Sequence, residues 1–368
     1  MICEDMKSFI VMDIVKEALK FEDTIHFEIG QPDIPPSNGV KEALKRAVDN
    51  DLFSYTQSYG LLELREKIVQ YYKNEYDVEI DSKQVLLTPG TSGAFLVAYA
   101  IALKHGGTLA LSDPSYPCYK NFASMLGVKS LFFNIGKENE YQLRVKDIDK
   151  KEFDAILISS PANPTGNIYD RENLKELVEY CDRKDIAFIS DELYHGLTYD
   201  KRADSALEFS ENAFVINGFS KYYCMPGLRL GWIVVPKRHL RSAEIVAQNL
   251  FISAPTLSQY GALEAFDKEY LKSTRDEFKR RRDFLYGELS RFFKIDAKPD
   301  GAFYLWADIS KYSDDSFGFA KKLLNDLHIA STPGVDFGSN RTNRYIRFAY
   351  TRDISHMQEG ISRLESYL

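Results

Sequence analysis

A lysine that follows a buried strand has the clearest chemical potential in this sequence. Lys221 comes after the apolar run 214–217 and the short turn 218–220 (GFS). A lysine at such a place loses part of its hydration, which lowers the pKa of its amine, so we predict a nucleophile able to form a Schiff base. Arg229 lies before the next apolar run, and its guanidinium can return to the same crevice and pair with a phosphate.

The segment 88–93 (TPGTSG) suits a second kind of chemistry, the binding of an anion. It lies between a predicted strand and a predicted helix. A Gly/Ser/Thr turn that opens a helix points several unpaired N–H groups in one direction, and the helix dipole adds to their attraction for an anion. No Gly-Lys-Ser/Thr follows, which excludes a nucleotide-binding P-loop. Because many turns contain glycine, a purely structural turn stays an alternative at this point.

Two further loops follow predicted strands. The loop 159–166 (SSPANPTG) presents the amide of Asn163, and Asp191 comes directly after another apolar strand. Open α/β folds bind their ligands at the carboxyl edge of the sheet, so we expect both side chains to face the same crevice as Lys221. Taken alone, the loop 159–166 is also consistent with a structural turn. Asp191, taken alone, is also consistent with a helix N-cap.

The elements that must position these residues alternate along the middle of the chain. Such alternation predicts an α/β fold in which helices cover both faces of a mostly parallel mixed sheet. The predicted strands are 84–88, 108–112, 130–134, 155–159, 187–190, 214–217 and 230–235, and the predicted helices include 61–76, 92–103 and 171–183.

The pattern changes after residue 259. Long helical stretches are followed by predicted strands at 302–308 and 345–350 and predicted helices at 317–327 and 354–368. This pattern indicates a smaller α+β domain. We therefore predict three parts, namely an N-terminal segment 1–38 that joins the small domain, a large domain 39–265 that binds the ligand, and a small C-terminal domain 266–368.

Composition and charge limit the classes of protein. The 368 residues include 47 Lys and Arg against 54 Asp and Glu, for a net charge of −7. This balance disfavours nucleic-acid binding, which needs clustered cations. We expect the one basic run, 279–282 (KRRR), to be a solvated helix face. The longest apolar stretch is about half of a membrane span, and the four cysteines fit no zinc pattern, so we expect no membrane anchor, no metal and a cytoplasmic location.

Ten short motifs, taken in their order along the chain, resemble those of the class I/II aminotransferases, which are fold-type-I enzymes dependent on pyridoxal 5'-phosphate. The resemblance runs from residue 30 to residue 347. The motifs are 30–33 (GQPD), Tyr55 with Gly60, 89–92 (PGTS), 113–116 (DPSY), 163–166 (NPTG), 191–194 (DELY), 220–221 (SK) with 226–231 (PGLRLG), 301–304 (GAFY), 333–338 (PGVDFG) and 345–349 (YIRFA).

The resemblance implies a role for each group around the cofactor ring. Lys221 would hold the cofactor as a Schiff base and then move a proton between the substrate's α-carbon and the cofactor. Asp191 would pair with the pyridine nitrogen and keep the ring protonated. Asn163 and Tyr194 would hydrogen-bond the phenolic oxygen of the ring, and Tyr116 would stack on its face.

The resemblance also implies how the phosphate and the substrate are held. The phosphate would bind to Gly90, Thr91, Ser92, Ser220 and Arg229. Tyr55 would reach that phosphate from a partner subunit, which implies a homodimer with its active site at the interface. Arg347 would bind the substrate's α-carboxylate through its planar guanidinium, with Gly30 and Asn163 completing the pocket.

The implied reaction is the transfer of an amino group between an L-amino acid and a 2-oxo acid by a ping-pong mechanism. The same residues also serve C–S β-lyases and other carbanion chemistry of this cofactor, and a non-catalytic regulatory module is a more distant alternative. Segment 247–253 (AQNLFIS) lacks an arginine for a second carboxylate, which disfavours aspartate as the substrate. Phe9, Ile10 and Met12 favour a neutral or apolar side chain, if the N-terminal segment reaches the pocket.

Overall fold

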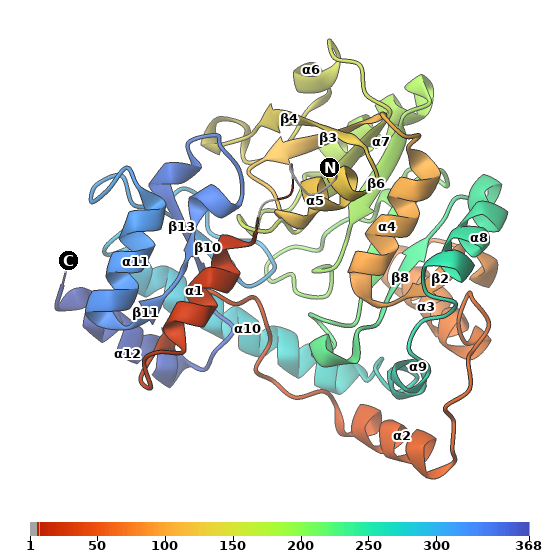
Figure 1. Ribbon diagram of the computed structural model, residues 1–368, viewed down its shortest axis with the longest axis horizontal. Coiled ribbons are helices and arrows are strands. Elements are labelled where there is room, and N and C mark those ends of the chain that lie inside the picture. The colour runs from red at the N-terminus through yellow and green to blue at the C-terminus, as the bar shows by residue number, and fades with distance from the viewer. Residues whose placement is uncertain (1–5, 7, 368) are drawn as a thin grey trace.

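A seven-stranded sheet forms the centre of the computed structural model, which describes residue 6 and residues 8–367 (Figure 1). The strands lie in the order β2-β8-β7-β6-β5-β3-β4. Neighbours pair in parallel except at β8, which runs antiparallel to both β7 and β2. The bounds are β2 Val85–Thr88, β3 Thr108–Asp113, β4 Lys129–Asn134, β5 Ala155–Ser159, β6 Ala187–Asp191, β7 Phe214–Gly218 and β8 Gly231–Val234.

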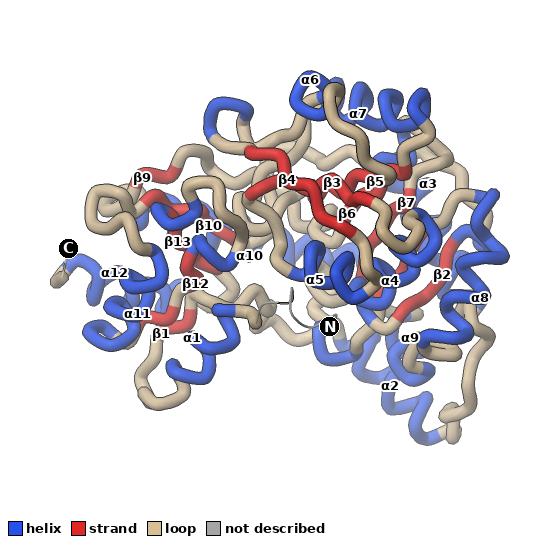
Figure 2. The backbone as a smooth tube through the Cα atoms, turned by 45° about the horizontal axis from the view of Figure 1, so that its top comes forward, coloured by secondary structure: helices blue, strands red, loops and turns tan. Residues whose placement is uncertain are grey.

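Helices cover both faces of this sheet (Figure 2). Successive residues of a strand point to opposite faces, and both sets are apolar here. Leu87 packs in one core with α3 and α7, whereas Leu86 packs in another with α4, α5 and α8. The predicted α/β fold with a mostly parallel mixed sheet is therefore confirmed. The helices are α3 Leu62–Tyr76, α4 Gly90–Ala102, α5 Cys118–Met125, α6 Val145–Ile148, α7 Arg171–Lys184, α8 Leu240–Leu250 and α9 Thr256–Ala262.

The C-terminal third adds a four-stranded antiparallel sheet in the order β12-β13-β10-β9 (Figure 1). The N-terminal segment reaches this part of the molecule, because β1 pairs with β11 and α1 packs against Leu324 and Ala330. The domain boundaries at residues 38 and 265 stay predictions. The elements are α1 Ile10–Ala18, β1 Ile25–His26, α2 Asn38–Asp49, α10 Lys268–Leu289, β9 Lys294–Ile295, β10 Tyr304–Asp308, α11 Ser316–Leu327, β11 Ile329–Ala330, β12 Thr332–Pro333, β13 Tyr345–Ala349 and α12 Ile354–Glu365.

Several elements were not predicted, each for a physical reason. Helix α2 buries Val40, Ala43 and Ala47, and two alanines give only a weak apolar period. Strands β1, β11 and β12 are two residues long, which is too short for any alternation to appear. Within the described ranges, no helix is long and apolar enough to cross a membrane.

The expectation for the basic run 279–282 was wrong for two of its residues. Arg281 and Arg282 are only 5% and 1% exposed. Arg281 pairs with Asp33 at 2.7 Å and with Glu277 at 2.8 Å, and Arg282 pairs with Asp200 at 2.8 Å. Arg281 and Arg282 lie on the buried face of α10 with Phe278 and Leu285, and a charge that is buried in this way needs a partner of opposite sign.

Candidate active site

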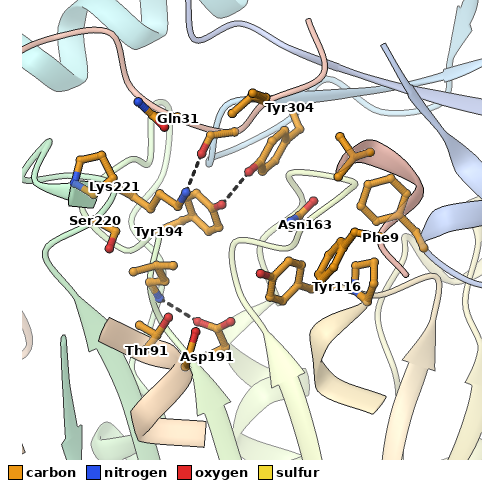
Figure 3. Close-up of a pocket in the computed structure, with 18 of the residues that line it drawn as sticks. Phe9, Gln31, Thr91, Tyr116, Asn163, Asp191, Tyr194, Ser220, Lys221 and Tyr304 are labelled. Carbon is orange, nitrogen blue, oxygen red and sulfur yellow. Dashed lines mark hydrogen bonds between the residues drawn. The ribbon is translucent and has the colours of Figure 1, made fainter. Parts of the chain in front are cut away.

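A cavity of about 480 Å³ opens at the carboxyl ends of β5, β6 and β7 (Figure 3). Its lining comes from segments far apart in the chain, including the N-terminal segment, the start of α4, the loop after β5 and strands β10 and β13. It is the size of a typical small-molecule site. The predicted residues that line it are Gly30, Thr91, Ser92, Tyr116, Asn163, Asp191, Tyr194, Ser220, Lys221, Arg229 and Arg347.

Lys221 lies just beyond the end of β7 and points into this cavity (Figure 3). Its Nζ donates a hydrogen bond to the backbone carbonyl of Gly30 at 2.5 Å. Burial lowers the pKa of Lys221 to about 8, and the positive charges of Arg347 and Arg229 act in the same direction. The amine is therefore neutral far more often at neutral pH than an exposed lysine, as a nucleophile or base requires.

Asp191 is buried at the end of β6 on the same side of the sheet. The hydroxyl of Tyr119 donates to its Oδ2, and the backbone N–H of Leu193 donates to its Oδ1 at 3.1 Å. Burial raises the pKa of Asp191 to about 6, while both hydrogen bonds oppose the rise. A cation that entered the cavity next to Asp191 would favour the charged carboxylate, because an opposite charge offsets the desolvation.

Tyr119 is a member of the site that the sequence analysis missed. It lies on α5 one helical turn after Tyr116, and the two rings meet edge to face with centroids 5.4 Å apart. Tyr116 precedes the helix, three residues before Tyr119, and its carbonyl accepts the backbone N–H of Tyr119 at 3.2 Å, which keeps the two side chains close together. That spacing was a signal available in the sequence, since Tyr116 was already assigned to the pocket.

Tyr194 and Tyr304 form a hydrogen-bonded pair above the lysine (Figure 3). Their hydroxyl oxygens are 2.8 Å apart, and both side chains are buried. A Cβ added to Gly30 would come to 1.9 Å from the Tyr304 hydroxyl, so only glycine lets the backbone pass there. Gly30 therefore serves the site through its carbonyl and its lack of a side chain.

Arg347 on β13 is buried at the far end of the cavity from the α4 N-terminus. Its Nη1 donates to Asn163 Oδ1 at 2.9 Å, and its Nη2 donates to Glu28 O at 2.5 Å and to Thr332 Oγ1 at 3.1 Å. Among the described residues, its Nε is buried without a hydrogen-bond partner. Such an orphan donor is costly and suits a carboxylate that enters the cavity.

The opposite end of the cavity is suited to an anion. Helix α4 begins there, and Thr91 and Ser92 of its first turn line the cavity with Ser220 and Arg229. Gly90 has a φ of +68°, and a Cβ at that position would lie 2.5 Å from Arg229 Nη2. The cation therefore sits directly against the helix N-terminus, where unpaired N–H groups already attract negative charge.

Tyr55, a predicted site residue, lies on the outer surface of its own chain. It is 77% exposed and does not line the cavity of its own chain. No group of three or more His, Cys, Asp or Glu side chains that could hold a metal ion occurs in the part of the chain that the structure describes.

The groups assembled in this cavity fit pyridoxal phosphate in three respects. Lys221 offers an amine with a lowered pKa, Asp191 offers a buried carboxylate, and the start of α4 with Arg229 offers an anion site. The phosphate, the ring nitrogen and the aldehyde of that cofactor need these three partners. Arg347 lies apart from them with an unused donor.

Comparison with known proteins agrees with this chemistry. The sequence profile described as aminotransferase class I and II matches residues 22–364. A (5-formylfuran-3-yl)methyl phosphate transaminase of Methanocaldococcus jannaschii is 39% identical over 375 residues, which span 99% of this chain and 98% of the relative. A valine–pyruvate aminotransferase of Mycobacterium tuberculosis is 34% identical, over 98% of this chain and 96% of its own.

Solved structures give the same result. The crystal structure of an aminotransferase from Mycobacterium tuberculosis superimposes with a TM-score of 0.95 at 33% identity, over 99% of this chain and 97% of its own. A putative aminotransferase from Silicibacter pomeroyi superimposes with a TM-score of 0.93 at 37% identity, over 99% of this chain and 97% of its own. The chain therefore belongs to the class I and II aminotransferases, a family of enzymes that use pyridoxal phosphate.

Proposed function

We propose that this enzyme transfers an amino group between an L-amino acid and a 2-oxo acid by a ping-pong mechanism, with pyridoxal phosphate attached to Lys221. When bound, the cofactor supplies an electron-withdrawing ring that weakens the bonds of the substrate's α-carbon. The observation that carries the proposal is that Lys221, Asp191 and Arg347 line one cavity with the start of α4.

Lys221 has two tasks in this proposal. Its amine would hold the cofactor through the aldehyde carbon. As a free amine, Lys221 would take the proton from the α-carbon of the substrate and return it on the cofactor side. A pKa of about 8 suits both tasks, since the group exchanges a proton readily near neutral pH.

Asp191 and Tyr119 hold the ring nitrogen in its protonated form. The Asp191 carboxylate would pair with the N–H of the ring, and the pKa of Asp191 would then fall because the pyridinium offsets its burial. Tyr119 orients the carboxylate through the hydrogen bond on Oδ2. Tyr116 would contact the face of the ring, and Asn163 and Tyr194 would hydrogen-bond its phenolic oxygen.

The remaining groups hold the two anionic ends. The phosphate would be held by Gly90, Thr91, Ser92, Ser220 and Arg229, which surround the start of α4. The α-carboxylate of the substrate would lie on the guanidinium of Arg347, with Asn163 and the backbone at Gly30 beside it. The unpartnered Nε of Arg347 supports this assignment.

We also propose a homodimer in which Tyr55 reaches the phosphate of the partner's site. Several large apolar side chains are exposed in two segments that lie side by side, joined by a hydrogen bond from Thr256 to Ser54. Exposed apolar clusters of this kind mark interaction surfaces. The cluster consists of Val48, Phe53, Tyr55, Leu62, Ile245, Leu250 and Ile252. Among the described residues, the free thiols of Cys118, Cys181 and Cys224 support the proposed cytoplasmic location.

The proposal is tested by fixing the cofactor on the protein with borohydride and locating it by peptide mass spectrometry. We expect the label on Lys221 and no label in Lys221→Ala. The matched control is Lys237→Ala, because Lys237 is exposed and pairs with Glu211 on the surface. Label on another lysine would contradict the assignment.

The type of reaction is tested on the wild-type holoenzyme without an oxo-acid acceptor. We expect an L-amino acid to convert the bound cofactor once to its amine form and to release one equivalent of the matching 2-oxo acid. Continuous release of pyruvate and ammonia from a sulfur-containing amino acid would instead assign the chain to the C–S β-lyases.

A further inference from the structure

The side of the cavity away from Lys221 is apolar. Figure 3 shows Phe9 and Tyr116 there, opposite Lys221 and Ser220, and the centroids of the two rings are 6.1 Å apart. Val11 and Met12 of α1 also line the cavity. The N-terminal segment thus reaches the cavity with apolar side chains, as expected from the sequence for Phe9 and Met12. Ile10 does not line it.

This apolar wall is continuous with the place of the substrate's α-carboxylate. The guanidinium carbon of Arg347 lies 4.9 Å from the centre of the Phe337 ring. Phe337 follows Asp336, whose Oδ1 and Oδ2 accept the backbone N–H groups of Ile10 and Val11 at 3.1 and 3.2 Å. Phe337, and through Asp336 the start of α1, therefore lie close to the place of a carboxylate on Arg347, within reach of the side chain of the substrate.

Charged side chains of both signs line the cavity. The positive side chains that line the cavity in the described part of the chain are Lys221, Arg229 and Arg347. The proposed function already uses all three. Asp336 lines the wall as well, and it is only 6% exposed. A second carboxylate on the substrate would meet this buried negative charge and no free cation.

We infer that the amino donor of this enzyme carries a large neutral apolar side chain, which Phe9, Met12 and Phe337 contact, and that Asp336 disfavours acidic side chains. The inference rests on the proposed function, since it places the donor at Arg347. Asp336 acts in two ways, because its charge repels a distal carboxylate and its two hydrogen bonds hold the start of α1 over the cavity.

The test is the single-turnover conversion of the holoenzyme by different donors, followed through the absorbance of the bound cofactor. This half-reaction needs no acceptor, so the choice of 2-oxo acid does not affect it. We expect phenylalanine, leucine and methionine to react with a specificity constant about 10- to 100-fold above that of alanine, which is the usual effect of burying a large apolar side chain. Aspartate should fall below alanine.

Two variants test the residues named. Phe9→Ala should lower the ratio of the constant for phenylalanine to that for alanine about tenfold, whereas Phe132→Ala, at an exposed phenylalanine on β4 outside the cavity, should leave that ratio unchanged. Asp336→Asn removes the charge with little change of size and should raise the ratio of aspartate to alanine about tenfold. The specificity constant for the substrate alanine shows whether a variant also slows the reaction in general by loosening α1.

The outcomes separate the inference from the proposed function. If aspartate reacts as well as phenylalanine in the wild type, or if Asp336→Asn leaves the ratio of aspartate to alanine unchanged, the inference is overturned while amino transfer stands. If no amino acid converts the cofactor to its amine form, the proposed function itself fails.

Discussion

Tyr119→Phe removes one hydrogen bond from Asp191 and leaves the ring of Tyr119 in place. In the structure, the hydroxyl donates to Asp191 Oδ2 and the N–H of Leu193 donates to Oδ1. Burial raises the pKa of Asp191 to about 6, and the Tyr119 hydroxyl opposes that rise. Without the hydroxyl, the charged form loses a donor, so the pKa of Asp191 must rise further.

The size of the effect follows from the strength of that bond. A hydrogen bond to a charged group contributes about 1.5–3 kcal/mol, and one pKa unit corresponds to about 1.4 kcal/mol. The pKa of Asp191 is therefore expected to rise by about 1–2 units in the variant. The ionised carboxylate of Asp191 binds the protonated ring, so the affinity for the cofactor falls as the pH falls through the pKa of Asp191. In the variant, this loss of affinity begins at a higher pH.

The assay is the Kd of pyridoxal phosphate for the apoprotein, measured from about pH 5.5 to about pH 9 for both proteins. The titrations of the cofactor phosphate and of Lys221 are common to both, so they cancel in the ratio of the two Kd values. We expect a ratio of variant to wild type near one at the alkaline end, rising to about 10–100 at the acidic end.

The control is Tyr169→Phe, which removes a buried hydroxyl that accepts the N–H of Leu143 at 3.0 Å, away from the cavity. Its ratio should not depend on pH. A ratio for Tyr119→Phe that is equally independent of pH would refute the reasoning, because it would show that the hydroxyl does not set the charge of Asp191.

Three further predictions concern the two ends of the cavity and the dimer. Arg347→Ala should leave the cofactor bound and raise the KM for every amino donor by a factor that corresponds to about 2–5 kcal/mol. An unchanged KM would show that Arg347 does not bind the carboxylate of the substrate. Gly90→Ala should weaken cofactor binding, because its Cβ would lie 2.5 Å from Arg229 Nη2; an unchanged Kd would contradict the phosphate site. A heterodimer that pairs a Tyr55→Phe subunit with a Lys221→Ala subunit should have about half of the wild-type activity, because one of its two sites then contains both Tyr55 and Lys221. Activity no higher than that of the Tyr55→Phe homodimer would show that Tyr55 acts in the site of its own subunit.

The position of the cavity could be predicted from the sequence because its reactive side chains lie at the ends of strands. Lys221, Asp191 and Asn163 each follow an apolar run, and parallel strands bring such positions to one edge of the sheet. The apolar runs matched β5, β6 and β7 closely, since a strand buried on both faces has few alternatives to a continuous apolar sequence.

The sequence pattern did not predict contacts between segments that lie far apart in the chain. Glu28 and Thr332 hold Arg347 through a backbone carbonyl and a hydroxyl, and neither has a spacing that relates it to position 347. The buried Arg281 and Arg282 show the same limit, because a run of basic residues on a helix has the same sequence whether solvent or protein covers it.

The α/β fold and the types of group available could be predicted from the residues alone, since hydrophobic periodicity and strand-end positions are local properties of the chain. The chemical state of these groups depends on tertiary contacts. The lowered pKa of Lys221 and the raised pKa of Asp191 both come from burial. Burial depends on what covers a side chain, and here the cover includes α1 and β13, which lie at opposite ends of the sequence.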